Sequence, residues 1–454
     1  DGNTRTTGEH SIPACNAGCI NDFYSRNIHE LLTHPQGTAA AAIYFDLCGN
    51  GTCSNRLHGC GFQDKFGREI KTFALLHKRE LIKRTVRQAH AADKQVWIHA
   101  QRSFFPMMNG LADFFFPGEQ FEALMARTLY PFTDEIPELI FKSEFNRNIL
   151  GTGVICWTAV TSLQRAKLPV KEKKRGTEAM ESMLLLHDID ASTVYAYQPV
   201  LASIWNIQRR YRVEKEGTKF FRFDRQTDIV ATDKRLRTSY YVSPEGYVLA
   251  AVCNTEPVKV SARINLGKFA RGLVSVREEY LGRTLPVTDG SFELSIPSRS
   301  FRLIGIRSPA PETWKLDYQA SAYNPARASN SEYFFDQKTG IHKLKKIDDK
   351  TYLLTAFVPV RSGFKYSLNL EHRQTNGNAV KWTLQPQFNG DASGLHAKTG
   401  QAISGNEWQK QTMEFPIPEN TSGQCFALLL TLTAEGIGSE TEFRNIEVIE
   451  TEFH

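Results

Sequence analysis

Short apolar runs alternate with amphipathic stretches over the first half of the chain. The apolar runs predict buried strands at 41–47, 95–99, 112–117, 153–157 and 185–189, because strands buried on both faces read as continuous apolar segments. The stretches between them carry apolar residues at helical spacing and predict helices at 68–92, 119–129, 172–186 and 199–208. This alternation is typical of an α/β fold with a parallel sheet.

About five strand–helix units precede residue 210, whereas a complete (β/α)8 barrel has eight units and about 250 residues. The pattern therefore predicts half or part of a (β/α)8 TIM barrel, or else an open sheet. The polar start, DGNTRTTGEH, reads like a loop within a longer protein. It favours the partial barrel, with residues 1–210 as its C-terminal part and an upstream half in the same or a companion chain.

The pattern changes after Tyr211 to short alternating strands separated by turn residues. Residues 211–308 predict an antiparallel β-sandwich, and a proline-containing linker follows. Residues 314–454 contain about eight further short strands, which are typical of a jelly roll. We therefore expect two all-β sandwich domains after the α/β part.

The composition is that of a globular protein, with 41% hydrophobic and 23% charged residues among 454. The net charge is only +6 and the basic residues are scattered, so nothing favours nucleic-acid binding. No apolar segment in the sequence is long enough to span a bilayer.

Five of the eight cysteines lie in the first sixty residues: Cys15, Cys19, Cys48, Cys53 and Cys60. They would suit one or two disulfides in an oxidising compartment, and they could equally be reduced thiols. Zinc coordination by Cys48, Cys53, His58 and Cys60 is an alternative that no CxxC spacing supports. We expect the loop from Cys48 to Cys60 to be a structural brace, with no metal and no other cofactor.

Two acidic residues follow predicted strands directly. Asp46 comes after the run AIYF, and Glu119 comes after FFFPG. Because parallel strands end at one edge of a sheet, both carboxylates should lie there, separated by the strand that ends in His99. A pair of facing carboxylates is the machinery of glycoside hydrolysis. The alternatives are that Asp46 caps its loop and that Glu119 stabilises the dipole of a following helix.

Other polar and aromatic residues at strand ends could contact substrate. His99 could bind a sugar hydroxyl or be a core histidine, Trp157 could stack on a sugar or pack in the core, and Asp190 could bind hydroxyls or cap a helix. His58 could lie at the same edge of the sheet, or it could only stabilise its own loop. It could also act as the base that activates a Cys48 nucleophile. The substrate-binding candidates are His58, His99, Gln101, Arg102, Trp157 and Asp190.

The chain resembles bacterial glycoside hydrolases in which a barrel is followed by a β-sandwich and a carbohydrate-binding-like jelly roll. The resemblance rests on the segments IYFDLC, CSNRLHGCGF, VWIHAQ and FFFPGEQF, which look like strand ends of a group distantly related to glycoside hydrolase family 123. That family uses an adjacent Asp-Glu pair, whereas here Asp46 is followed by Leu47. The spacing is more similar to the α-galactosidase-like clan, which implies Asp46 as nucleophile and Glu119 as acid/base.

The resemblance implies a secreted or periplasmic, retaining glycosidase acting on a poly- or oligosaccharide. Two hypotheses from other classes stay open. One is a non-catalytic carbohydrate-binding protein, and the other is a hydrolase that depends on the Cys48, Cys53 and Cys60 loop or on a metal held there.

Overall fold

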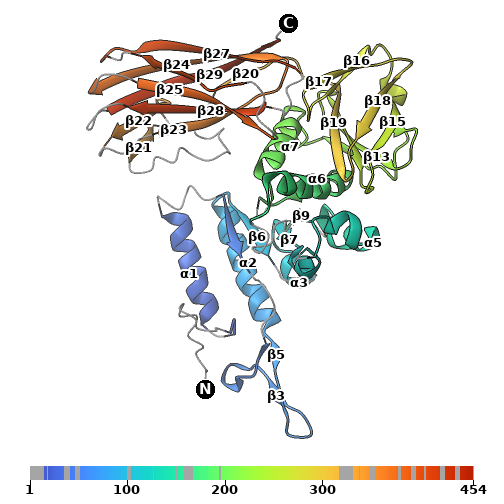
Figure 1. The fold of residues 1–454 in the computed structure, drawn as a ribbon. Coiled ribbons are helices and arrows are strands. Elements are labelled where there is room, and N and C mark those ends of the chain that lie inside the picture. The colour runs from blue at the N-terminus through green and yellow to red at the C-terminus, as the bar shows by residue number, and fades with distance from the viewer. Residues whose placement is uncertain are drawn as a thin grey trace. The chain divides into compact units, whose positions relative to one another are not determined.

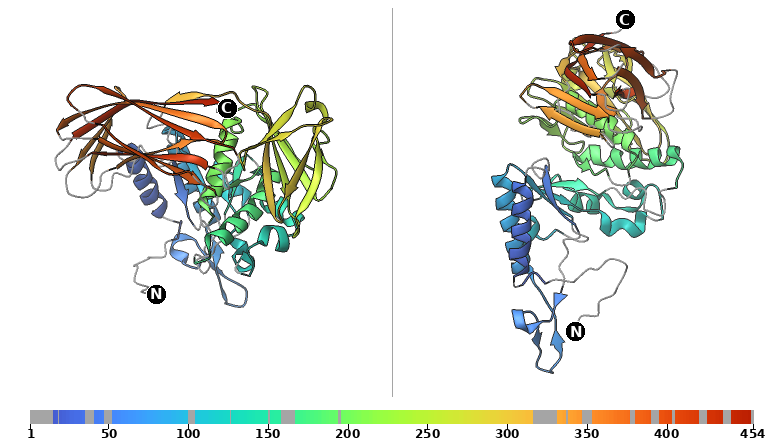
Figure 2. Two further views of the ribbon diagram at one scale, coloured as in Figure 1. Left: turned by 45° about the horizontal axis from the view of Figure 1, so that its top comes forward. Right: turned by 90° about the vertical axis from the view of Figure 1, so that its left-hand side faces the viewer.

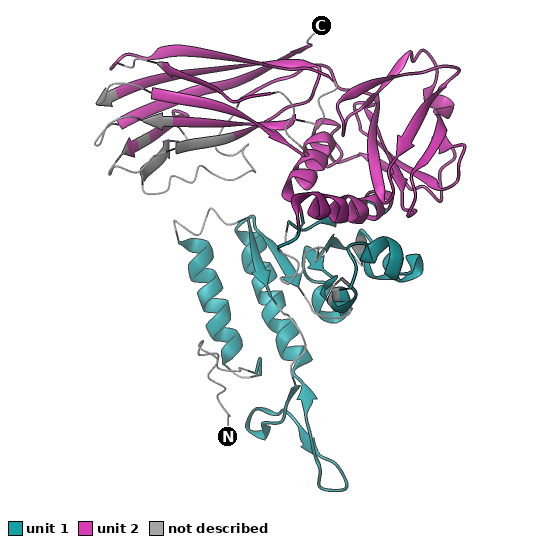
Figure 3. Cartoon of the chain, viewed as in Figure 1, with its two compact units in different colours: residues 1–168, 187–196 teal, residues 169–186, 197–454 magenta. Residues whose placement is uncertain are grey.

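The computed structural model describes the chain from residue 15 to residue 452, with internal gaps. The described ranges are 15–17, 19–34, 41–46, 52–99, 104–125, 127–149, 151–157, 167–193, 196–315, 331–336, 338–346, 353–376, 380–389, 395–402, 405–419, 425–434 and 440–452. The chain divides into two compact units (Figure 3). Unit 1 comprises Asp1–Leu168 and His187–Ala196, and unit 2 comprises Pro169–Leu186 and Tyr197–His454. The fold is mixed α/β, with a sheet-rich C-terminal half (Figure 1).

A parallel sheet forms the centre of unit 1. Its strand order is β1-β6-β7-β9-β10, and β8 pairs antiparallel with β9. The predicted strands at 41–47, 95–99, 112–117 and 153–157 are confirmed, with somewhat different bounds. The strands are β1 (Ala42–Phe45), β6 (Gln95–His99), β7 (Phe114–Phe116), β8 (Asn148–Ile149), β9 (Thr152–Cys156) and β10 (Asp190–Ala191).

The strand predicted at 185–189 is wrong. Helix α6 (Val170–His187) continues through most of this segment, and the strand β10 begins only at Asp190. Leu185 and Leu186 are buried in a cluster of unit 2. A short run of buried leucines satisfies a helix and a strand equally well, so its apolar pattern could not separate the two.

The helices of unit 1 are shorter or more broken than predicted. The helix expected at 68–92 is α2 (Leu75–Ala91), because the residues before it form two short strands. The helix expected at 119–129 is a 3-10 turn followed by one turn of α-helix. The sequence reading missed helices α1 (Ile20–Thr33), α3 (Pro106–Asn109) and α5 (Glu138–Glu144) and the π-helical turn η4 (Pro131–Glu135).

A small hairpin extension joins β1 to α2 and is visible at the bottom of Figure 1. Two short antiparallel pairs build it, β2 with β5 and β3 with β4. A single 3-10 turn, η2, lies between β2 and β3. The bounds are β2 (Thr52–Cys53), η2 (Arg56–His58), β3 (Phe62–Gln63), β4 (Glu69–Ile70) and β5 (Thr72–Phe73).

The two faces of the parallel sheet differ in character. Val96 and Ile98 of β6 are fully buried and pack with Ile82 and Ala89 of α2. The opposite face carries a row of rings in register, in which Tyr44 pairs with Trp97 and Trp97 pairs with Phe114. All three rings are partly solvent-exposed. The strand ends on this ring-bearing face carry the candidate site.

The first part of unit 2 fits a β-sandwich. A six-stranded sheet of order β11-β13-β14-β19-β16-β17 faces the three-stranded sheet β12-β15-β18 across a buried apolar cluster. Helices α6 and α7 (Gln198–Arg210) cover the other face of the larger sheet. The helix predicted at 199–208 is thus confirmed as α7, with a proline in its first turn. The strands are β11 (Lys219–Phe221), β12 (Val230–Ala231), β13 (Leu236–Val242), β14 (Val248–Asn254), β15 (Val260–Asn265), β16 (Ser275–Glu278), β17 (Arg283–Pro286), β18 (Ser291–Ile296) and β19 (Ser300–Arg307).

The C-terminal part of unit 2 also fits a β-sandwich (Figure 2). One sheet has the order β21-β22-β29-β24-β27 with β20 paired to β29, and the other has the order β23-β28-β25-β26. Eighteen buried apolar residues form the cluster between them. The strands are β20 (Thr313–Lys315), β21 (Ser331–Asp336), β22 (Ile341–Lys346), β23 (Leu353–Pro359), β24 (Phe364–Asn376), β25 (Val380–Phe388), β26 (Lys398–Ala402), β27 (Gln409–Ile417), β28 (Cys425–Ala434) and β29 (Glu440–Glu452).

Among the described residues, no helix combines the length and the apolar character that crossing a membrane requires.

Candidate active site

Four neighbouring strands of unit 1 bring chemically active side chains to one edge of the sheet. Asp46 follows β1, His99 ends β6, Glu119 follows β7 and Trp157 follows β9. These strands are parallel neighbours, so their carboxyl ends lie together. In α/β proteins, the side chains that bind ligands and carry out catalysis usually lie at this edge of the sheet.

His99 lies between the two acids. Its Nδ1 is 2.9 Å from Oδ1 of Asp46, within hydrogen-bond distance. Its Nε2 is 3.2 Å from Oε2 of Glu119, an ion-pair distance. The His99 side chain is 1% exposed, whereas Asp46 is 61% and Glu119 27% exposed. The buried imidazole is therefore hydrogen-bonded to Asp46 and lies close to Glu119, and both acidic side chains are partly exposed to solvent.

Tyr44 adds a second partner for Asp46. Its hydroxyl donates to Oδ1 of Asp46 at 3.3 Å. Burial, followed by the negative charges of Asp46 and Glu119, holds the pKa of Tyr44 well above its ordinary value. The phenol thus stays a hydrogen-bond donor to Asp46.

Trp157 covers the histidine. Its ring stacks on His99 with the centroids 4.4 Å apart and the planes 7° from parallel. The two residues sit on strands separated by β7, and Gly118 follows β7 beside Trp157. A Cβ at Gly118 would lie 2.7 Å from the carbonyl oxygen of Trp157, and the φ of +132° is one that other residues rarely adopt. Glycine at this position leaves room for the backbone of Trp157 to approach the end of β7.

The remaining predicted residues lie elsewhere or outside the described part. Asp190 begins β10 opposite Ile155 and is exposed. His58 lies in the hairpin extension beside Cys53. Gln101 and Arg102 fall outside the described residues. Asp46, His99, Glu119 and Trp157 therefore lie together at one edge of the sheet. His58 lies apart from them, among the cysteines of the hairpin extension.

Sequence reasoning missed two contributors to this site, Tyr44 and Gly118. Tyr44 precedes Asp46 by two residues, and strand side chains two apart point to one face. That period could have identified Tyr44 as a neighbour of the acid. No comparable signal exists for Gly118, because its importance depends on the close approach of the backbone of Trp157, which follows another strand.

The hairpin extension holds the one group of possible metal ligands found among the described residues: Cys15, Cys53, His58 and Cys60. The expected loop brace is not present as a disulfide there, since every described cysteine is free. Cys48, which the sequence placed in this group, falls outside the described residues. Cys15 is a ligand candidate that the sequence reading had left out of the set.

No protein-family model matches the chain, and no curated protein matches it. Several solved structures are similar to it at low sequence identity. One is the isomalto-dextranase of Arthrobacter globiformis T6 complexed with panose, with 12% identity, a TM-score of 0.33, and coverage of 94% of this chain and 71% of that one. Another is the CBM22-2 xylan-binding domain of Paenibacillus barcinonensis Xyn10C, with 13% identity, a TM-score of 0.25, and coverage of 30% and 99%.

A third similar structure is the arabinose-bound MgGH51 α-L-arabinofuranosidase, with 14% identity, a TM-score of 0.23, and coverage of 32% of this chain and 25% of that one. All three TM-scores are too low to fix the fold or the activity of this chain.

Proposed function

We propose that this protein is a glycoside hydrolase that cleaves a poly- or oligosaccharide with Asp46 and Glu119. The observation that carries the proposal is that both carboxylates contact one buried imidazole, that of His99. Two solvent-accessible acids fixed at the carboxyl ends of parallel strands are what this reaction requires.

The spacing of the two acids suits the reaction. Since a single imidazole lies between them, their near oxygens are at most about 8 Å apart. Catalytic carboxyl pairs are about 5–5.5 Å apart in retaining and about 6.5–9.5 Å apart in inverting glycosidases. The upper limit is compatible with both, and the strand-end similarity to the α-galactosidase-like clan favours retention.

In the retaining reaction, an oxygen of Asp46 attacks the anomeric carbon while Glu119 gives its proton to the departing glycosidic oxygen. Glu119 then takes a proton from water, and the resulting hydroxide displaces Asp46 from the sugar. His99 and Tyr44 both bond to Oδ1 of Asp46, so they orient this carboxylate. We assign them as positioning residues, because His99 is too buried to touch a substrate.

The parallel sheet is proposed to be part of a (β/α)8 barrel whose other strands belong to an upstream half in the same or a companion chain. The partly exposed rings of Tyr44, Trp97 and Phe114 support this, since they lie on the face that would line a barrel. The C-terminal sandwich is proposed to be a carbohydrate-binding module. A secreted or periplasmic location would suit a polysaccharide substrate.

The experiment is hydrolysis of a panel of polysaccharides, oligosaccharides and aryl glycosides by the full chain. Asp46→Asn and Glu119→Gln should each lower turnover by at least about a hundredfold, as expected for groups that react directly with the substrate. Asp46→Gly with added azide should give a glycosyl azide if Asp46 is the nucleophile.

Asp113→Asn is the matched control. Asp113 precedes β7 and accepts the backbone N–H of Val96 at 2.7 Å, so it lies at the opposite end of the strand from Glu119. Its replacement should leave turnover on the active substrate unchanged. Binding of glycans without any hydrolysis would favour the carbohydrate-binding alternative, and folded variants with full activity would refute the two-acid mechanism.

A further inference from the structure

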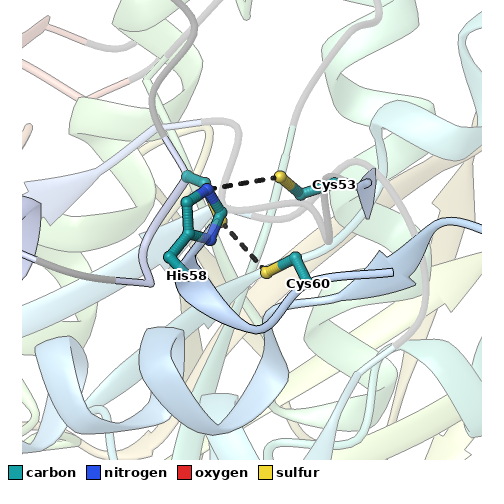
Figure 4. Close-up of side chains that lie close together, drawn as sticks. Cys53, His58 and Cys60 are labelled. Carbon is teal, nitrogen blue, oxygen red and sulfur yellow. Dashed lines mark hydrogen bonds between the residues drawn. The ribbon is translucent and has the colours of Figure 1, made fainter. Parts of the chain in front are cut away.

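The hairpin extension of unit 1 brings three sulfur atoms and an imidazole to one point. Cys53 ends β2, and His58 and Cys60 come from the short segment between β2 and β3 (Figure 4). Cys15 comes from the segment before α1. One donor atom from each residue lies within 4.8 Å of all the others. The Sγ atoms of Cys15 and Cys60 are 3.6 Å apart, and Sγ of Cys53 is 3.8 Å from Nε2 of His58.

These distances match the edges of a metal tetrahedron. With Zn–S bonds of about 2.3 Å and Zn–N bonds of about 2.0–2.1 Å, tetrahedral ligands lie roughly 3.5–3.8 Å from one another. A disulfide between Cys15 and Cys60 would instead need the two sulfurs at about 2 Å. The two measured separations thus equal tetrahedral edges, and the other pairs, all within 4.8 Å, are close enough for a shift of about 1 Å to complete the coordination site.

The backbone around the cysteines suits thiolate ligands. The N–H of Ala17 points at Sγ of Cys15, and the N–H of Asn55 points at Sγ of Cys53, each at 3.4 Å. Hydrogen bonds of this kind fix and stabilise the charged residues that bind a metal ion. They also help to fix the positions of two of the four sulfur and nitrogen ligands, Cys15 and Cys53.

Two glycines allow the loop to close on the cluster. Gly59 has φ +78° and follows His58 directly, in the left-handed conformation that ends η2. Gly61 has φ +74°, and a Cβ there would lie 2.8 Å from Cα of Ser54. Both positions need glycine, so the sequence HGCG is what places Cys60 opposite Cys53.

We propose that Cys15, Cys53, His58 and Cys60 bind one zinc ion in a structural site. Three thiolates and one imidazole are the ligand set that selects zinc among common divalent ions. All four tetrahedral positions are filled by protein, which leaves none for a substrate or a reactive water. The ion ties the segment before α1 to the hairpin extension across 45 residues of sequence, and it stabilises the fold without taking part in hydrolysis.

The test is the metal content of the full chain, purified under reducing conditions without a metal-affinity step. Elemental analysis should give about one zinc per chain, and exchange with cobalt should give the visible bands of a tetrahedral cobalt–thiolate complex. Chelation should lower the melting temperature. His58→Ala and Cys60→Ser should lose the metal, whereas His58→Cys should keep it, because a fourth thiolate replaces the imidazole.

Cys19→Ser is the matched control, because Cys19 is an exposed cysteine near Cys15 that is outside the cluster. This variant should retain zinc and the wild-type melting temperature. If Cys60→Ser does not fold, Cys53→Ser gives the same comparison at a less buried position. The proposal is refuted by a reduced chain that takes up neither zinc nor cobalt, by metal retention in His58→Ala, or by a Cys15–Cys60 disulfide in the protein before reduction.

Discussion

Replacing Gly118 with alanine tests how the candidate site is assembled. Gly118 leaves room for Trp157, whose ring stacks on the histidine that contacts both acids. The added methyl group would lie 2.7 Å from the carbonyl oxygen and 3.1 Å from Cβ of Trp157. Both distances are shorter than a normal contact, so the backbone at Trp157 or the end of β7 has to move, and Trp157 would carry its ring with it.

Two costs add up in this variant. A non-glycine residue held at φ +132° stores about 1–3 kcal/mol of backbone strain. Overpacking against Trp157 costs about 1–3 kcal/mol more. We therefore expect Gly118→Ala to lower the free energy of unfolding by about 2–6 kcal/mol. If Trp157 moves instead, part of this cost becomes a loss of activity, because His99 loses its stacking partner.

Gly151→Ala separates the two costs. Gly151 precedes β9 and has φ +94°, but a Cβ there would meet nothing within 4 Å. It should therefore show the strain alone, about 1–3 kcal/mol. Urea unfolding of both full-length variants, followed by tryptophan fluorescence and circular dichroism, gives the two values. Equal losses in the two variants would refute the argument that the close approach of Trp157 requires glycine.

Two further predictions concern unit 2. Complete burial of Glu278, opposed by the nearby arginines Arg302 and Arg283, raises the pKa of its carboxyl from 4.5 to about 7. The folded state thus binds this proton more tightly, so stability should fall as pH rises from about 4.5 to about 7. Glu278→Gln should flatten that part of a plot of melting temperature against pH, and an unchanged slope would contradict the assignment. In the C-terminal sandwich, Trp408 is half-buried beside the guanidinium groups of Arg373 and Arg444, at 4.7 and 3.9 Å. If it supplies the proposed sugar platform, Trp408→Ala should weaken retardation of the full chain on polysaccharide gels by about 2–10-fold, and undiminished retardation would exclude this ring.

The sequence by itself determined that an α/β region is followed by sheet-rich regions, and it showed which polar residues follow the strands of the parallel sheet. Buried parallel strands read as continuous apolar runs, so the segments ending at Asp46, His99 and Glu119 were recognisable without a structure. The alternating patterns of the C-terminal half likewise indicated sandwiches. Such patterns depend only on which neighbouring positions face a core, and this information is local.

Local patterns failed where two structures satisfy the same sequence. Residues 185–189 were expected to form a strand, yet the buried leucines there end helix α6. Their burial depends on the sheet of unit 2 against which they pack. The predicted start of α2 was wrong for a similar reason. The first residues of the expected helix instead form two short strands, β4 and β5, which pair with β3 and β2 of the hairpin extension.

Only the tertiary structure decided how the site residues meet. It placed one imidazole between Asp46 and Glu119, and it laid Trp157 over His99 across a strand whose glycine leaves space. It also brought the Sγ atoms of Cys15 and Cys60 to 3.6 Å from each other, which no spacing rule in the sequence predicts. Contacts between residues tens of positions apart are set by strand register and by the packing of distant segments, and a sequence pattern with a period of two or four residues carries no record of either.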